Sequence, residues 1–284
     1  MEPALADRPP SLATRALVER LQSPSASVPV LPALAQQVIA LASAPDTPVW
    51  RIAGIVSKDQ VLAARLLGLA NTAYCSPLQP VGTVSEAIVR LGTAAVRNLV
   101  VTVCFTSRLH DPKVYGSRGR DFIDHGLGTA YLARLVAERA GQGTDAAFLY
   151  GLLHDIGKLV VLKTAHDLVR QGQPAVPPDE LDAVMADLHA HAGGAALRRW
   201  QLPEELCTPV EWHHAPAEAP EPTARVAYLA NRLSHRYGFG CAAVTDPPLL
   251  DEPFARELGL DEAWLCDVDQ RAPALFEIAR SILA

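Results

Sequence analysis

The sequence has few cysteines and does not arrange them in pairs. Five cysteines occur in 284 residues, and none forms a Cys-x-x-Cys motif. This scatter excludes a disulfide framework and a cysteine-rich zinc site, and it favours free thiols in a reducing compartment. The five are Cys75, Cys104, Cys207, Cys241 and Cys266.

A leader sequence and long apolar runs are also absent. Met1 to Pro10 has no basic region followed by an apolar stretch, so we expect no secretory signal. No apolar run approaches the roughly 20 residues that a helix needs to cross a bilayer. We therefore expect a soluble, cytoplasmic protein without a membrane partner. A net charge of −6 argues against nucleic acid as a partner.

No segment alternates apolar and polar residues for long enough to predict a sheet. Apolar residues make up 49% and charged residues 20%, which is a globular composition. Apolar positions recur with helical spacing, so we predict an all-α fold. Residues 238–271 carry no readable pattern. Helices are expected near 12–21, 32–44, on either side of 57–59, and near 85–91, 93–105, 121–140, 145–154, 158–171, 179–199, 203–213, 221–237 and 272–283.

The stretch Gly151 to Lys158 carries the clearest chemical signal. It places His154 and Asp155 side by side after an apolar helical run. An imidazole and a carboxylate on consecutive residues can bind one cation from two directions, as zinc, iron or manganese sites require. Lys158, one turn later, suits an anionic substrate. The alternative is that His154 and Asp155 only cap the end of a helix.

Further histidines lie before and after this pair. His189 and His191 are about 200° apart around a helix, so only one can face a common centre. His213 and His214 are about 100° apart and can both reach a shared or dinuclear site. His125 lies in an earlier helix, and a helical bundle can bring such residues together. A buried polar network is the alternative explanation. We interpret His110, His166 and His235 as ordinary hydrogen-bonding residues.

Several segments together resemble one family. The order of His125, His154–Asp155 and a late polar residue resembles the HD superfamily of metal-dependent phosphohydrolases. Over roughly residues 25–240 the chain is more similar to the HDOD family, the HD-related output domain of bacterial signalling proteins. The segments that carry this resemblance are Leu31–Leu34, Ile55–Gln60, Leu66–Tyr74, Ser85–Gly92, and His189 through Trp200–Pro203 to His213–His214.

The resemblance implies a helical bundle in which an HD-like half packs against an N-terminal helical subdomain. We expect an N-terminal extension at 1–25, an HDOD domain at 26–240 and a C-terminal helical extension at 241–284. The HDOD domain would divide into 26–115 and 121–240. The final helix is a candidate to dock on the core or on another chain, which would give a homo-oligomer.

The resemblance also implies a metal site, related to that of HD-GYP cyclic-di-GMP phosphodiesterases. One or two divalent ions, of iron, manganese or zinc, are expected. Asp155 and Lys158 would be the catalytic residues, with Lys158 neutralising phosphate charge. The expected metal ligands are His125, His154, Asp155, His189, His213, His214 and Asn231.

Two departures from the family pattern bear on function. Ala215 to Glu218 follow His214 without a Gly-Tyr-Pro motif, which argues against cyclic-di-GMP hydrolysis. The late aspartate of the HD pattern is replaced by Asn231, whose neutral amide is a weaker ligand and a poor proton acceptor. Asp246 is a more distant candidate for that position.

These features leave competing functions. We favour a non-catalytic signalling module that binds a partner protein or a nucleotide-like ligand and holds metal at its HD site. The alternative is a metal-dependent phosphohydrolase acting on a nucleotide or cyclic nucleotide. A DNA-linked regulator would use a basic strip of Arg225, Arg232 and Arg236, although a solvated helix face explains these residues better.

Overall fold

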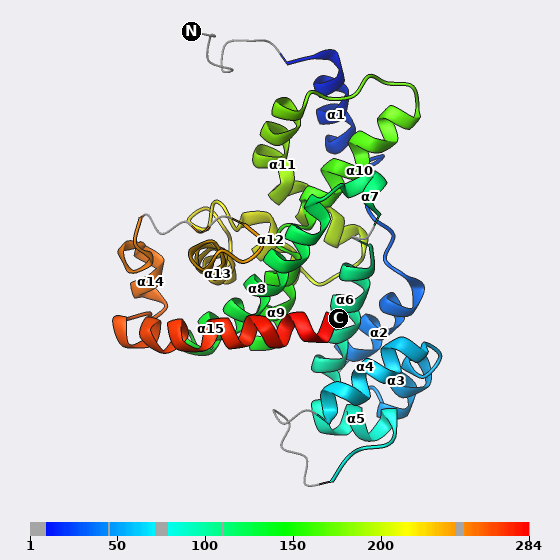
Figure 1. Ribbon diagram of the computed structural model, residues 1–284, viewed down its shortest axis with the longest axis vertical. Helices are drawn as coiled ribbons and strands as arrows, with labels where there is room; N and C mark the ends of the chain where they lie inside the picture. The colour runs from blue at the N-terminus through cyan, green and yellow to red at the C-terminus, as the bar shows by residue number, and fades with distance from the viewer. Residues whose placement is uncertain are drawn as a thin grey trace.

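The computed structural model describes residues 10–44, 46–71, 79–108, 111–241, 243 and 247–283, and within them the regular elements are helices without a strand (Figure 1). The all-α prediction is confirmed. The first helices are α1 (Leu12–Gln22), α2 (Ala33–Ser43), α3 (Val49–Val56), α4 (Gln60–Ala70), α5 (Val84–Leu91), α6 (Thr93–Arg108) and α7 (Pro112–Tyr115). The later elements are α8 (Arg118–Arg139), α9 (Thr144–Leu153), α10 (Ile156–Arg170), α11 (Pro178–Arg199), α12 (Glu204–Trp212), α13 (Thr223–Tyr237), the 3-10 turn η3 (Leu249–Asp251), α14 (Pro253–Glu257) and α15 (Glu262–Leu283).

Side-chain caps set several of these boundaries. Asp59 accepts hydrogen bonds from the backbone N–H groups of Val61 and Leu62 and so begins α4. Thr83 and Glu86 form a reciprocal capping box at the start of α5. Gly92, at φ 83°, ends α5 and lets the chain turn at once into α6.

Among the described residues, no single helix is long and apolar enough to cross a membrane. The pair formed by α5 and residues 93–106 of α6 meets the length and composition requirement only with a bend of 110° between its two parts.

The N-terminal helices separate into two groups. Helices α2 to α5 pack around α6 at the lower right of Figure 1, and α6 leads to α9 in the centre. Helix α1 lies instead against α10 and α11 at the top. Its start is tied there because Ser11 N and Thr14 Oγ1 both donate to the Glu180 carboxylate of α11. Residues 12–22 therefore cover α10 and α11 and not the group formed by α2 to α6.

The connection between the two groups is fixed by Trp200, at the end of α11. Its Nε1 donates to the Pro29 carbonyl at 3.0 Å. The indole is half-buried and packs on the main hydrophobic cluster. The Trp200–Pro203 segment therefore holds the linker that leads from α1 to α2.

The C-terminal segment docks on α8 and α13. Helix α15 begins at Glu262, ten residues before the expected start at 272, so that boundary was wrong. Asp261 caps the helix by accepting from Trp264 N at 2.7 Å. Pro273 lies inside α15 and interrupts the helical pattern in the sequence. Helix α15 contacts α8, whose lower end it crosses in Figure 1, and its Val268 and Ala272 belong to the main hydrophobic cluster.

Ion pairs fasten this segment to α13. Arg225 pairs with Glu257, Arg232 pairs with Glu252, and Arg236 pairs with Asp269 at 3.2 Å. The three arginines that form a basic strip in the sequence are thus each engaged with an acidic residue of the same chain.

Candidate metal centre

The seven ligand candidates come from six places in the fold and meet between the central helices. His125 lies in the middle of α8, and Asn231 lies in α13. His154 is the C-cap position of α9 and Asp155 precedes α10, where its side chain makes no capping hydrogen bond, so the pair does more than cap one helix end. His189 comes from α11, while His213 and His214 directly follow α12. All except His214 are buried.

One half of the centre is formed around His125. The Nε2 atoms of His125 and His154 are 3.2 Å apart. Asp155 Oδ2 lies 3.6 Å from the first and 3.5 Å from the second. Asn231 Oδ1 is 3.1 Å from His125 Nε2 and completes this group.

The other half is formed around His189. Its Nε2 lies 3.3 Å from His213 Nε2 and 3.1 Å from His214 Nε2. Asp155 Oδ1 lies 3.2 Å from His189 Nε2 and 3.8 Å from His213 Nε2. The Asp155 carboxylate therefore presents one oxygen to each half.

The buried histidines all turn Nε2 inward in the same tautomer. His154, His189 and His213 donate Nδ1–H to the carbonyls of Gly151, Met185 and Val210, at 2.7 to 2.8 Å. His125 donates Nδ1–H to the carbonyl of Phe239 at 3.0 Å. A carbonyl can only accept, so each Nδ1 carries the proton and each neutral ring keeps a lone pair on Nε2. This is the arrangement in which imidazole ligates a metal.

These lone pairs face one another and Asp155 Oδ1, whereas Asp155 Oδ2 accepts a hydrogen bond from Lys158 Nζ at 2.6 Å. Asp155 Oδ1 is buried and has no hydrogen-bond donor, although His189 Nε2 is near. Unpaired acceptors in a buried site are unfavourable unless a cation lies between them. Nitrogen ligands at about 2.1 Å from one ion are separated by roughly 3.0–3.4 Å. The Nε2 separations of 3.1 to 3.3 Å match that spacing, so the residues fit a pair of divalent ions.

Burial keeps the ligands in the required protonation states. It lowers the pKa of His154 to about 3, and partial desolvation together with the neighbouring His189 lowers the pKa of the partly exposed His214 to about 4. Burial likewise lowers the pKa values of His125 and His213. Burial alone would raise the pKa of Asp155, but His154 and Lys158 hold it well below its usual range. These lowered pKa values keep His125, His154, His213 and His214 neutral near pH 7, and the Asp155 carboxylate is charged, as metal ligation requires.

Lys158 lies beside the centre, and His191 points away from it, as the sequence predicted. Lys158 Nζ is 2.6 Å from Asp155 Oδ2 and remains 26% exposed, so the ammonium reaches both the centre and solvent. Its Nζ is 6.0 Å from the centre of the Phe122 ring. His191 is 72% exposed and pairs with Glu211. Only His189 of that pair faces the centre, as the helical angle predicted.

Close helix packing brings the two halves together at Gly157. A Cβ at this position would lie 1.7 Å from the His189 carbonyl oxygen, inside any possible contact. The absence of a side chain lets α10 approach α11, and this places Asp155 beside His189.

Sequence reasoning missed three neighbours of His125. The rings of His235 and His125 are 4.9 Å apart, and Cys241 Sγ lies 3.3 Å from His235 Nδ1. Ser234 Oγ lies 3.2 Å from His125 Nδ1. His235 follows Asn231 by one helical turn, and this spacing could have predicted that it lies near the metal centre. No comparable spacing in the sequence predicts that Cys241 lies near α8. Asp246 and His110 lie outside the described residues, as does Cys75.

Known proteins resemble this chain over much of its length. An uncharacterized protein of Treponema pallidum is 28% identical over 202 residues, which is 68% of this chain and 39% of the relative. Ribonuclease Y of Thermosipho melanesiensis is 29% identical over 118 residues, 42% of this chain and 19% of the enzyme. The chain thus spans well under half the length of these relatives.

Solved structures share the fold. An HDOD domain protein of unknown function from Geobacter sulfurreducens superposes with a TM-score of 0.69 at 20% identity, over 95% of this chain and 97% of that one. A proposed metal-dependent phosphohydrolase from Shewanella amazonensis SB2B gives a TM-score of 0.66 at 20% identity, over 93% and 97%. The sequence model of the HDOD domain matches residues 28–216. This chain belongs to the HDOD domain family.

Proposed function

We propose that this protein is a metal-dependent phosphohydrolase whose HD centre holds two divalent ions and acts on a nucleotide or cyclic nucleotide. One observation carries the proposal: imidazole lone pairs from four helices converge with Asp155 Oδ1 in a site that offers them no hydrogen-bond donor, while Asp155 Oδ2 accepts from Lys158. A polar network built only for stability would pair donors with acceptors.

Each half of the centre would hold one ion of iron, manganese or zinc. Asp155 would contribute one carboxylate oxygen to each half. When bound, such ions polarise a phosphoryl oxygen and lower the pKa of water. The ligands would be His125, His154 and Asn231 in one half and His189, His213 and His214 in the other.

The residues at the open side would receive the phosphate. Lys158 and His214 are the members of the centre that reach solvent. The Lys158 ammonium offers a positive charge to an anionic oxygen, and it is held in place by Asp155 at 2.6 Å. His154 and His213, in contrast, are completely buried. A substrate phosphate would therefore enter past Lys158.

The comparisons support this class of reaction. A ribonuclease and a proposed phosphohydrolase are among the proteins with similar sequence or fold. At 20% identity the structural likeness speaks only for the fold, so the chemistry rests on the ligand geometry of this chain.

Hydrolysis assays with metal-replete protein test the proposal. Manganese-, iron- and zinc-loaded samples would be incubated with bis-p-nitrophenyl phosphate, nucleoside triphosphates and cyclic mono- and dinucleotides. We expect turnover of at least one, and a loss of about 100-fold in Lys158→Ala without loss of metal. Lys163→Ala is the matched control, because Lys163 pairs with Asp167 at 2.9 Å away from the centre. Metal-replete protein that hydrolyses none of these compounds would contradict the proposal.

A second candidate is a non-catalytic signalling module with a structural metal centre. Asn231 favours it, because a neutral amide replaces the late carboxylate of the HD pattern. The missing Gly-Tyr-Pro motif after His214 agrees with it. The two candidates differ in one result: both retain metal, and only the first hydrolyses phosphate esters.

The location, the partners and the domain boundaries of the protein are also proposals. We place the protein in the cytoplasm of a bacterium, with a signalling protein or a nucleotide-like ligand as its partner. An N-terminal extension (1–25), an HDOD domain (26–240) and a C-terminal extension (241–284) would be its functional parts. Limited proteolysis of the purified chain, with mass spectrometry of the fragments, tests these boundaries.

A further inference from the structure

One buried histidine of the metal centre is oriented from far away in the sequence. His154, His189 and His213 donate Nδ1–H to carbonyls three or four residues earlier in the chain. The carbonyl that orients His125 belongs to Phe239, 114 residues later. Local helix geometry therefore fixes three of the ligands, while the fourth depends on how Phe239 is held. Phe239 lies beyond residue 216, where the family match ends.

A tight turn presses Phe239 against α8. Gly238 and Gly240 flank it in the left-handed region, at φ 68° and 64°. A Cβ at Gly240 would lie 2.1 Å from the Asp121 carbonyl oxygen, one turn before His125. A Cβ at Gly128 would lie 2.4 Å from the Phe239 ring. The ring thus rests on a part of α8 that carries no side chain.

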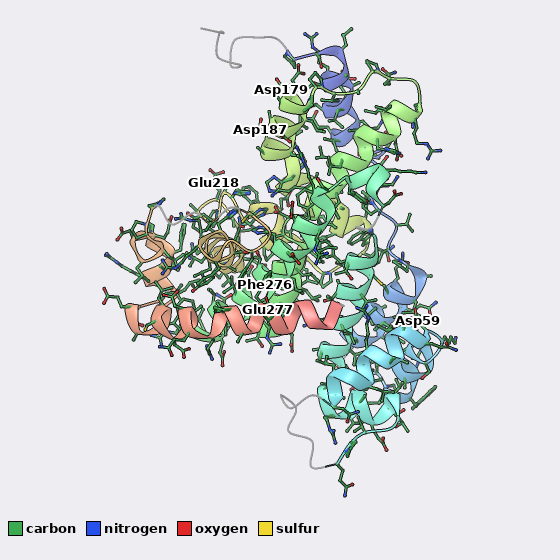
Figure 2. All side chains as sticks on the ribbon, viewed as in Figure 1. Asp59, Asp179, Asp187, Glu218, Phe276 and Glu277 are labelled. Atoms are coloured by element: carbon green, nitrogen blue, oxygen red, sulfur yellow. The ribbon has the colours of Figure 1, made fainter. Side chains whose placement is uncertain are left out.

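Phe276 of α15 stacks on that ring. The two phenyl rings are stacked, with centroids 4.1 Å apart and planes 7° apart. Figure 2 labels Phe276 in the later part of α15, the helix that contacts α8. Ala272 and Phe276 also line a small apolar hollow beside the Phe239 ring. The Phe239 ring therefore packs against both α8 and α15, and the Tyr237 ring lies beside it with centroids 5.6 Å apart.

The rest of the C-terminal segment has its own attachments. Arg139 pairs with Asp261 at 2.8 Å, and the Tyr237 hydroxyl donates to Asp269 at 2.6 Å. Exposed ion pairs contribute little one by one, but here they are spread along α8 and α13. Loss of one ring from α15 should therefore leave the segment docked.

We propose that Phe276 is a positioning residue for the His125 half of the metal centre. Its ring holds Phe239, and the Phe239 carbonyl holds the His125 imidazole with Nε2 turned toward His154 and Asp155. This inference rests on the metal centre of the proposed function. It assigns a role in that centre to the C-terminal helix, which lies outside the segment that defines the family.

Cobalt binding to the full chain tests the role. In Phe276→Ala we expect the dissociation constant of the His125 half to rise about 10- to 100-fold, the usual effect of losing a group that orients a metal ligand. Binding by the His189 half should stay unchanged. Phe276→Tyr keeps the stacked ring and should restore binding. Phe254→Ala is the matched control, because Phe254 belongs to the same segment but packs against Tyr228, with ring centres 6.0 Å apart.

A second readout needs no metal and separates this inference from the proposed function. The ¹⁵N shifts of His125 in chelator-treated protein should show one Nδ1–H tautomer in the wild type and a mixture in Phe276→Ala. If the chain bound no metal, the proposed function would fail while this readout still decided the role of Phe276. Should Phe276→Ala not fold, Phe276→Leu replaces it in both measurements. An unchanged His125 tautomer, or an equal effect in Phe254→Ala, would overturn the inference.

Discussion

The two halves of the metal centre share Asp155 but are assembled differently. The His189 half has three imidazoles, and the two buried ones are oriented by carbonyls of their own helical turns. The His125 half has two imidazoles and a neutral amide, and it needs both α13 and Phe239. Imidazole is a stronger ligand than an amide for zinc or iron. We therefore expect the His189 half to bind an ion more tightly than the His125 half, whose geometry would depend on the C-terminal segment through Phe239.

The largest expected effect removes the residue that the halves share. Asp155→Ala takes one oxygen from each half and leaves Lys158 without its partner. We expect both ions to be lost, with a fall in Tm because an occupied site stabilises the fold by mass action. Plasma mass spectrometry on protein purified without an affinity tag or chelator measures this. Asp167→Ala, which breaks the Lys163 pair instead, should keep both ions. Unchanged metal content in Asp155→Ala would refute the ligand assignment.

Variants of a single half should separate the two ions. His213→Ala is expected to abolish the tighter binding step, and His125→Ala the weaker one. Each variant should keep about one ion per chain, since the other half retains its own histidines. Isothermal titration with cobalt resolves the two steps. His191→Ala is the control, because His191 is exposed and pairs with Glu211. Loss of both steps in either single variant would show that the halves are not independent.

A smaller change should bring the halves closer in affinity. Asn231→Asp puts a carboxylate 3.1 Å from His125 Nε2 in place of an amide. A charged oxygen binds divalent ions more strongly, and we expect the weaker step to tighten by about tenfold, or roughly 1.4 kcal/mol. The tighter step should not move. The same cobalt titration measures this. Weaker cobalt binding by the His125 half in Asn231→Asp would contradict the assignment of Asn231 to that half.

The smallest effect is a pH dependence of the metal-free fold. Burial lowers the pKa of His154 to about 3 and that of His214 to about 4. In the unfolded chain both would titrate near 6.5, so the unfolded state binds more protons below that pH. The contribution of these two histidines to the free energy of unfolding should therefore be constant above about pH 6.5. It should decrease as the pH drops from there toward 4. Thermal melts in chelator from pH 7.5 to 4.5 measure it. A Tm that rises on acidification would contradict neutral, buried ligands.

Local patterns in the sequence predicted much of this site. The angle between His189 and His191 predicted that one of them faces inward, and His189 does. The adjacent His213 and His214 were expected to reach a shared site, and both approach His189. Such residues could be found because helical geometry alone decides where they point.

Long-range contacts could not be predicted in this way. The stacking of Phe276 on Phe239 joins a turn after α13 to a helix whose start was placed ten residues too late. His235 was interpreted as an ordinary histidine, yet its ring lies 4.9 Å from that of His125. These positions follow from how α8, α13 and α15 pack, and no periodicity within one helix encodes that packing.

Two unequal metal sites in one centre are the central claim, and cobalt titration of the unmodified chain tests it most directly. Two binding steps of different affinity, with a total of two ions per chain, are predicted. A single step, two equal steps, or no binding at neutral pH would contradict the account.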